Sequence, residues 1–132
     1  MIEIEADVTP SKRISAPPLV PAAEPAIDRT HLARMTLGEK SLEAEVLALF
    51  DRQADLLLAR MTDAPPTAVA TFAHTLRGSA QGIGVWQVAA AAAAVERAAS
   101  GSDRADLADA VKQLAAAIGE ARAAIAALLR GT

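Results

Sequence analysis

Apolar residues recur every three or four positions along most of the chain, which is the spacing of amphipathic helices. Proline pairs, glycines and a Ser-Gly-Ser segment interrupt this pattern and mark helix ends. The pattern predicts five helices, at about residues 28–38, 39–61, 66–83, 85–99 and from 103 onward. Asp28 is a candidate N-cap for the first helix, and Ser102 or Asp103 for the last.

The two longest predicted helices each carry an apolar stripe. In the second helix the stripe comprises Leu42, Val46, Leu49, Phe50, Leu56 and Leu57. In the last helix the apolar positions alternate in steps of four and three, which is typical of a bundle seam: Leu107, Val111, Leu114, Ile118, Ala121, Ile125 and Leu128. Four long helices joined by short loops predict an all-α fold, an antiparallel up-down four-helix bundle with the short first helix across one end.

The N-terminal segment differs from the rest, because five of the seven prolines lie within the first 25 residues. Proline lacks a backbone donor and restricts the residue before it, so a helix is not expected there. We interpret residues 1–26 as a flexible Pro-rich arm and residues 27–132 as the bundle. A short docking strand at residues 2–8 is the alternative interpretation of the arm.

Composition narrows the class of protein. Alanine occupies 34 of the 132 positions and only three residues are aromatic, which favours helices over a sheet. The absence of cysteine excludes thiol chemistry. A net charge of −3 does not indicate the basic surface that binding of nucleic acid requires. The longest apolar run, residues 88–95, is too short to span a membrane, and no signal peptide is evident. We therefore expect a soluble, cytoplasmic protein.

The third predicted helix carries the candidate chemistry. Its apolar positions cluster around Leu76, which places His74 and Gly78 on the opposite, solvent-facing side with Arg77 at its edge. A glycine within a helix costs about 1 kcal/mol relative to alanine, and this chain uses alanine freely elsewhere. Gly78 therefore suggests that another molecule approaches the backbone beside His74.

A carboxylate is predicted to lie next to this histidine. His74 is ten residues before the turn at Gly84 and Glu96 is twelve residues after it, so the two lie level on neighbouring antiparallel helices. A carboxylate that accepts a hydrogen from Nδ1 leaves Nε2 free as a nucleophile. Arg77 could offset the charge of a phosphoryl group. Because no phosphate-binding glycine loop accompanies these residues, we expect another protein to donate the phosphoryl group.

Residues 73–84, AHTLRGSAQGIG, closely resemble the phosphorylation-site signature of histidine-containing phosphotransfer (HPt) domains, H-x-L-[KR]-G-S-[AS]-x-x-[IL]-G. Residues 27–61 are similar to the first two helices of that family, and residues 89–96 to its alanine-rich fourth helix. The resemblance covers about residues 27–131 and leaves only the arm outside.

The resemblance implies a role for each residue of the site. His74 would be the phosphoacceptor, modified at Nε2, and Glu96 would orient its imidazole by holding Nδ1. Arg77 would occupy the basic position, and Gly78 would give the partner close access. Gln81 also faces the site, at a position where the family varies.

The resemblance further implies a phosphoprotein of two-component signal transduction, without kinase activity of its own. It would carry phosphohistidine in a phosphorelay, reversibly, between aspartates on the receiver domains of response regulators and hybrid histidine kinases. Mg²⁺ would be bound by the partner receiver only, and this chain would need no cofactor or metal. Leu32 and Met35 are candidates for the docking surface, and we expect a monomer.

Other interpretations remain open. The chain could be a helical adaptor that binds a receiver or a kinase without transfer, although an adaptor does not need His74, Gly78 and Glu96 together. The phosphoacceptor domain of a chemotaxis-type kinase is disfavoured, because no ATP-binding segment is present. His31 is interpreted as a surface residue, and its pairing with His74 at a metal site is disfavoured because no third ligand is suitably spaced. Trp86 is expected to cap the turn end of the core.

Overall fold

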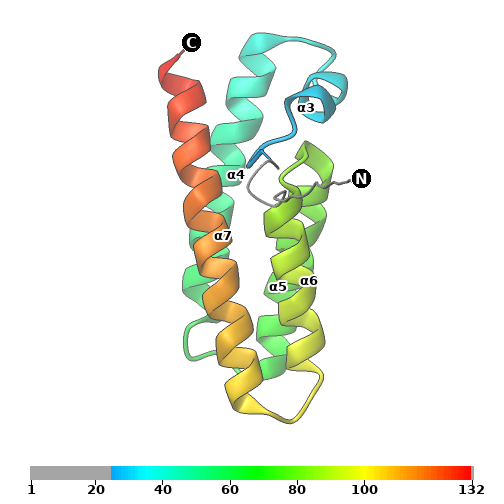
Figure 1. Ribbon diagram of the computed structural model, residues 1–132, viewed down its shortest axis with the longest axis vertical. Coiled ribbons are helices and arrows are strands. Elements are labelled where there is room, and N and C mark those ends of the chain that lie inside the picture. The colour runs from blue at the N-terminus through cyan, green and yellow to red at the C-terminus, as the bar shows by residue number, and fades with distance from the viewer. Residues whose placement is uncertain (1–24, 132) are drawn as a thin grey trace, which may run out of the picture.

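The computed structural model describes residues 25–131, which form five helices and contain no strand (Figure 1). The helices are α3 (Arg29–Met35), α4 (Lys40–Met61), α5 (Pro66–Ile83), α6 (Trp86–Ala99) and α7 (Arg104–Arg130). These bounds agree closely with the helices predicted from the sequence. Residues 1–24 of the predicted arm lie outside the described residues, and Pro25 and Ala26 are not helical.

The four long helices form a closed ring of contacts. Helix α4 packs against α5 and α7, and α6 packs against the same two helices. Successive long helices run in opposite directions, and α3 lies at the end of the bundle that holds the α5–α6 turn (Figure 1). The structure thus confirms the predicted all-α fold, a four-helix bundle with a short additional N-terminal helix.

The helix ends follow the local signals in the sequence. Asp28 caps α3 by accepting a hydrogen bond from the backbone of His31 (3.0 Å), and Asp103 caps α7 in the same way. Pro66 occupies the first turn of α5, where its missing N–H costs nothing. Gly84 ends α5 with a φ of +87°, a left-handed conformation that favours glycine.

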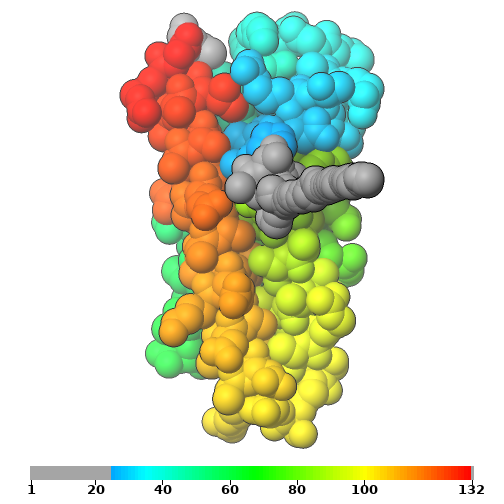
Figure 2. Space-filling model, viewed as in Figure 1, coloured from blue at the N-terminus to red at the C-terminus, as the bar shows by residue number. Residues whose placement is uncertain are grey.

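Helix α3, blue in the space-filling view, lies beside the start of α4 in cyan (Figure 2), and polar contacts hold it against the α5–α6 turn. Asp28 N–H donates to Gly84 O (2.8 Å), and Trp86 Nε1–H donates to Asp28 Oδ2 (2.9 Å). His31 Nε2 is 3.0 Å from Gly82 O, and its ring contacts the Trp86 ring edge to face. His31 is therefore half-buried and fixes the position of α3, which corrects its interpretation as a plain surface residue.

The core-facing stripe of α4 differs from the predicted one. The buried side chains are Leu47, Phe50, Ala54, Leu57 and Met61. The predicted stripe was wrong at Leu42, Leu49 and Leu56, which are 36%, 58% and 50% exposed. Helix α4 carries two apolar stripes about 100° apart, one buried and one formed by the exposed leucines. The prediction merged the two, because alanine at position 54 is too small to identify the buried stripe from the sequence.

Alanine fills the interior where α5 and α6 pack together. These two helices make the most extensive contact in the bundle, and the buried alanines on them are Ala73, Ala80, Ala89 and Ala92. Small side chains allow the two backbones to approach closely, because the distance between packed helices depends on the side chains at the contact. The alanine-rich sequence of α6 therefore determines how near its outer residues come to α5.

Replacement of a buried alanine in α6 should destabilise the bundle. We expect Ala92→Leu to lower the free energy of unfolding by about 1–3 kcal/mol, since its added carbons have no space in a core position with 0% exposure. Ala90→Leu, at an exposed position of the same alanine run, is the matched control and should be nearly neutral. Urea denaturation of both variants measures this difference, and equal stabilities would contradict the packing described here.

Candidate functional site

The outer face of α5 presents His74 to solvent. Its side chain is 69% exposed, while Ala73 and Leu76, which face the interior of the bundle, are fully buried. The inner face of α5 thus carries apolar residues that pack in the core, and its outer face carries the accessible histidine. A reacting molecule can reach this imidazole without any change in the bundle.

Three side chains from two helices meet at this point. Nδ1 of His74 lies 3.1 Å from Oε1 of Glu96, which projects from α6. Arg77, one turn after His74 on α5, donates from Nε to Oε2 of Glu96 at 2.6 Å. Its Nη2 also lies 3.0 Å from Nδ1 of His74. The carboxylate therefore joins the arginine and the histidine across the α5–α6 contact.

This arrangement occupies one ring nitrogen and leaves the other open. Nδ1 can donate to Glu96 or accept from Arg77, but not both at once. When Nδ1 carries the hydrogen it donates to Glu96, the guanidinium of Arg77 makes no hydrogen bond to the ring, and the lone pair resides on Nε2. Among the described residues, Nε2 of His74 has no hydrogen-bond partner. The site can therefore present a neutral imidazole with an exposed, oriented nucleophilic nitrogen.

Glu96 is held in its ionised form. Partial burial raises the pKa of this carboxyl, but hydrogen bonds from His74 and Arg77, together with the positive charge of Arg77, outweigh it and place the pKa below its ordinary value. At neutral pH Glu96 is therefore a carboxylate, able to accept a hydrogen from Nδ1. It can also stabilise positive charge that develops on the ring.

The bond between Arg77 and Glu96 was not anticipated from the sequence, which suggested only that Arg77 lies near His74. The available signal was its position at the edge of the outer face of α5, on the side that faces α6. Arg77 is only 32% exposed because it lies along this contact. Its charge is partly neutralised by Glu96, but its guanidinium remains directly beside the imidazole.

Gly78 and Gln81 are both exposed on α5, beyond His74. A Cβ atom added to Gly78 would meet no other atom within 4 Å, so packing within this chain does not require a glycine there. Gln81 makes no side-chain hydrogen bond within residues 25–131. These two residues leave an unobstructed strip of helix beside the histidine.

The two residues predicted to form a docking surface, Leu32 and Met35, differ in exposure. Met35 is 57% exposed, but Leu32 is 1% exposed and belongs to the core, so the prediction that Leu32 contributes to a docking surface is wrong. Leu32 lies on the side of α3 that faces the bundle, where burial of its side chain attaches the short helix. The sequence interpretation instead missed the exposed leucines of α4, which it had assigned to the core.

Residues 25–131 contain no group of three or more His, Asp or Glu side chains arranged to hold a metal ion. Nε2 of His31 is engaged by Gly82 O. None of the described helices combines the length and the apolar character that crossing a membrane requires.

Comparison with known proteins gives a matching family model and a solved structure of similar fold. Residues 39–128 match the family model of the Hpt domain. The fold is similar to the X-ray structure of a rice protein described as a histidine-containing phosphotransfer protein, with a TM-score of 0.71 and 17% identity over 80% of each chain. At this level of identity, the similarity shows a common fold. No curated protein sequence matches the chain.

The site should make stability depend on pH through Glu96. Because its pKa is lower in the folded chain than in the unfolded one, the ionised group stabilises the fold above its ordinary value of 4.5. This contribution is lost as the pH falls through the folded-state pKa. We therefore expect Glu96→Gln to lower the free energy of unfolding at pH 7, by a margin that shrinks toward about pH 3.

Urea denaturation at both pH values measures this margin. Glu120→Gln, which removes one exposed carboxylate from α7, is the control for loss of charge alone. If the margin between wild type and Glu96→Gln is the same at both pH values, Glu96 is not stabilised by its two partners.

Proposed function

Because the chain belongs to the Hpt domain family, we propose that it is a histidine phosphotransfer protein that carries a phosphoryl group on Nε2 of His74. The observation that carries this proposal is the state of the imidazole. It is 69% exposed, its Nδ1 lies 3.1 Å from Oε1 of Glu96, and no described residue forms a hydrogen bond with Nε2. Hpt domains are phosphoryl carriers in phosphorelays, and we assign this chain the same role, without kinase activity of its own.

The proposed reaction is a transfer from the aspartyl phosphate of a receiver domain. The Nε2 lone pair attacks phosphorus, the P–O bond to the aspartate breaks, and the aspartate carboxylate leaves with the electron pair. The phosphoryl group is then bonded to Nε2, and the ring keeps the hydrogen on Nδ1 and gains positive charge. Glu96 stabilises this charge from 3.1 Å, which favours transfer. The reverse sequence returns the group to an aspartate.

Arg77 supports the reaction through its position. Its guanidinium lies one turn from His74 and within 3.0 Å of the ring, where it can donate to an oxygen of the arriving phosphoryl group. Its bond to Glu96 also fixes the carboxylate that orients the imidazole. We therefore assign Arg77 two tasks, charge compensation and positioning of Glu96.

The ligands for Mg²⁺ are assigned to the partner. Glu96 is the only carboxylate that contacts His74 in the described part of the chain, and its two oxygens are bonded to His74 and Arg77. That bonding fits a residue that orients the ring and leaves little capacity for a hard cation, which needs several free oxygens. In this proposal the receiver holds the ion and the acidic groups around it.

Label transfer tests the assignment of His74. A receiver domain carrying radiolabelled aspartyl phosphate should transfer its label to the wild-type chain, as an acid-labile and alkali-stable phosphohistidine. His74→Gln should abolish the labelling, because it removes the nucleophile. His31→Gln, at the only other histidine of the chain, is the matched control and should retain it.

Two results would count against the proposal. Label that persists in His74→Gln would place the phosphoryl group elsewhere. Binding of receivers to the wild-type chain without any label transfer would instead favour a helical adaptor.

Gly78 should limit stability and promote transfer. Gly78→Ala is expected to raise the free energy of unfolding by about 0.5–1 kcal/mol, since alanine is the better helix former and the added Cβ meets no atom of this chain. The same variant should slow transfer from the receiver, because the Cβ stands where the partner approaches.

Gly119→Ala provides the matched control, since Gly119 lies within α7 and its added Cβ also meets nothing within 4 Å. It should give the same stabilisation with an unchanged transfer rate. Equal transfer rates for both alanine variants would exclude close approach of the partner at Gly78.

A further inference from the structure

A hollow of about 440 Å³ opens between α3, α4 and α7. These helices lie together at the end of the bundle where α4 begins and α7 ends (Figure 1). Four leucines form its apolar wall: Leu32 from α3, Leu47 from α4, and Leu128 and Leu129 from α7. Its volume falls within the range of protein pockets that hold ligands, about 300–1,000 Å³, so it can receive more than one aliphatic side chain.

Positive charge lies at the edge of this apolar wall. Arg29, Lys40 and Glu43 also line the hollow. Glu43 is 13% exposed, and its Oε1 lies 3.8 Å from Nζ of Lys40. Arg29 is exposed and forms no ion pair with any of residues 25–131. The hollow therefore offers an apolar surface together with a cation that no described carboxylate neutralises.

The start of the chain has the complementary pattern. Residues 2–8 have the sequence IEIEADV, in which apolar and acidic side chains alternate without a basic residue. In an extended segment, successive side chains point to opposite sides. Such a segment would present isoleucine, alanine and valine on one side and three carboxylates on the other. Its apolar side fits the leucines of the hollow, and its acidic side fits Arg29 and Lys40.

The chain between this segment and the bundle is long enough to reach the hollow. An extended chain spans about 3.3 Å per residue, so the sixteen residues 9–24 can bridge up to about 50 Å. The described part of the chain begins at Pro25, and Arg29 at the edge of the hollow is only four residues further on. Little intrinsic affinity is required, because a linker of this length gives an effective concentration on the order of millimolar.

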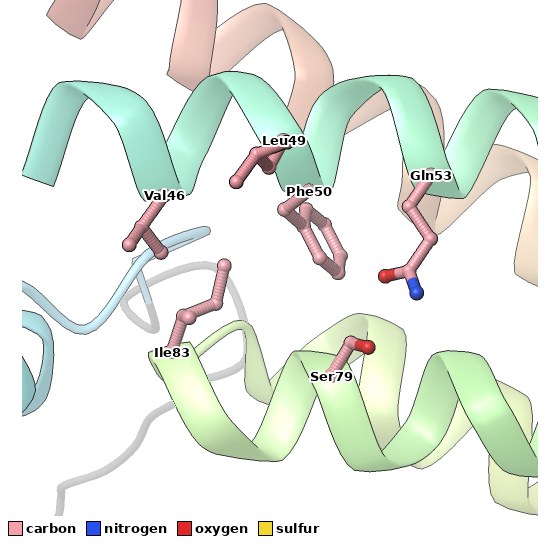
Figure 3. A pocket seen from close by; sticks show the side chains of 6 residues that line it. All are labelled: Val46, Leu49, Phe50, Gln53, Ser79 and Ile83. Atoms are coloured by element: carbon pink, nitrogen blue, oxygen red, sulfur yellow. The ribbon is translucent and has the colours of Figure 1, made fainter.

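Another apolar hollow of the bundle suits the acidic segment less well. It lies between α4 and α5, where four side chains of α4 and two of α5 point into it from opposite sides (Figure 3). They are Val46, Leu49, Phe50, Gln53, Ser79 and Ile83. None of these six is charged, so the carboxylates of residues 2–8 would find no partner there. Charge therefore distinguishes the two hollows.

We propose that residues 2–8 of this chain dock in the hollow between α3, α4 and α7. The apolar side chains of the segment contact the leucines, and its carboxylates pair with Arg29 and Lys40. The docked segment connects α3 to α7, in addition to the hydrogen bonds that hold α3 at the α5–α6 turn. No residue of α5 or α6 lines the hollow, so His74 remains accessible while the segment is bound. The docking is therefore independent of the proposed phosphotransfer.

Disulfide trapping in the full chain tests this docking, because the chain has no cysteine of its own. One cysteine replaces Ile4, and a second replaces either Leu128 at the proposed hollow or Leu49 at the hollow of Figure 3. In dilute protein with oxidised glutathione, the Ile4→Cys/Leu128→Cys pair should close an intramolecular disulfide about tenfold faster than the Ile4→Cys/Leu49→Cys pair. Leu49 is the more exposed position, so accessibility alone would favour the opposite result. Circular dichroism before oxidation should show wild-type helix content in both variants.

Charge reversal at the edge of the hollow tests the pairing of charges. Arg29→Glu, added to the Ile4→Cys/Leu128→Cys variant, should slow disulfide closure by about threefold or more, because like charges then face each other. Arg52→Glu is the matched control. It makes the same change in net charge at an exposed position of α4 outside this hollow, so closure should keep its rate.

Four results would overturn the proposal. Equal closure rates for the two cysteine pairs would show random encounters only. Faster closure with Leu49→Cys would assign the segment to the hollow between α4 and α5. Disulfides that form only between molecules would assign the hollow between α3, α4 and α7 to a second copy of this chain. Equal slowing by Arg29→Glu and Arg52→Glu would exclude the charge pairing on which the choice of hollow depends.

Discussion

The close contact between α5 and α6 is the constraint on which the site depends. His74 and Arg77 belong to one helix and Glu96 to the other, so their hydrogen bonds exist only while the two backbones remain near each other. Buried alanines on both helices permit that approach. The core and the reactive histidine are thus coupled through geometry, because a bulkier interior would withdraw the carboxylate that orients the imidazole.

Much of the fold is local and could be predicted from the sequence. The caps at Asp28 and Asp103 and the turn at Gly84 depend on neighbouring residues, so their positions follow from residue type and spacing. The level placement of His74 and Glu96 was equally predictable, because it requires only the helical rise and the position of the turn between them. The fold and the central pair of the site were therefore available before any coordinates.

The features that could not be predicted depend on which side of each helix the other helices cover. Helix α4 carries two apolar stripes, and only its neighbours determine that Leu57 is buried while Leu56 is exposed. Leu32 was assigned to the surface because a short helix gives no periodic pattern that identifies its inner side. The bond from Arg77 to Glu96 depends on side-chain rotamers, which spacing alone does not fix. Tertiary contact, and not helix propensity, decided each of these cases.

The single tryptophan gives the molecule an internal optical reporter. The chain has no tyrosine, so its ultraviolet fluorescence comes almost entirely from Trp86. This indole donates to Asp28, contacts the ring of His31 and begins the helix that carries Glu96. Detachment of α3 would break the bond to Asp28 and change the polarity around the ring. The fluorescence emission of an unlabelled sample would therefore report whether α3 is attached to the bundle. It would do so independently of circular dichroism, which reports the loss of helix content.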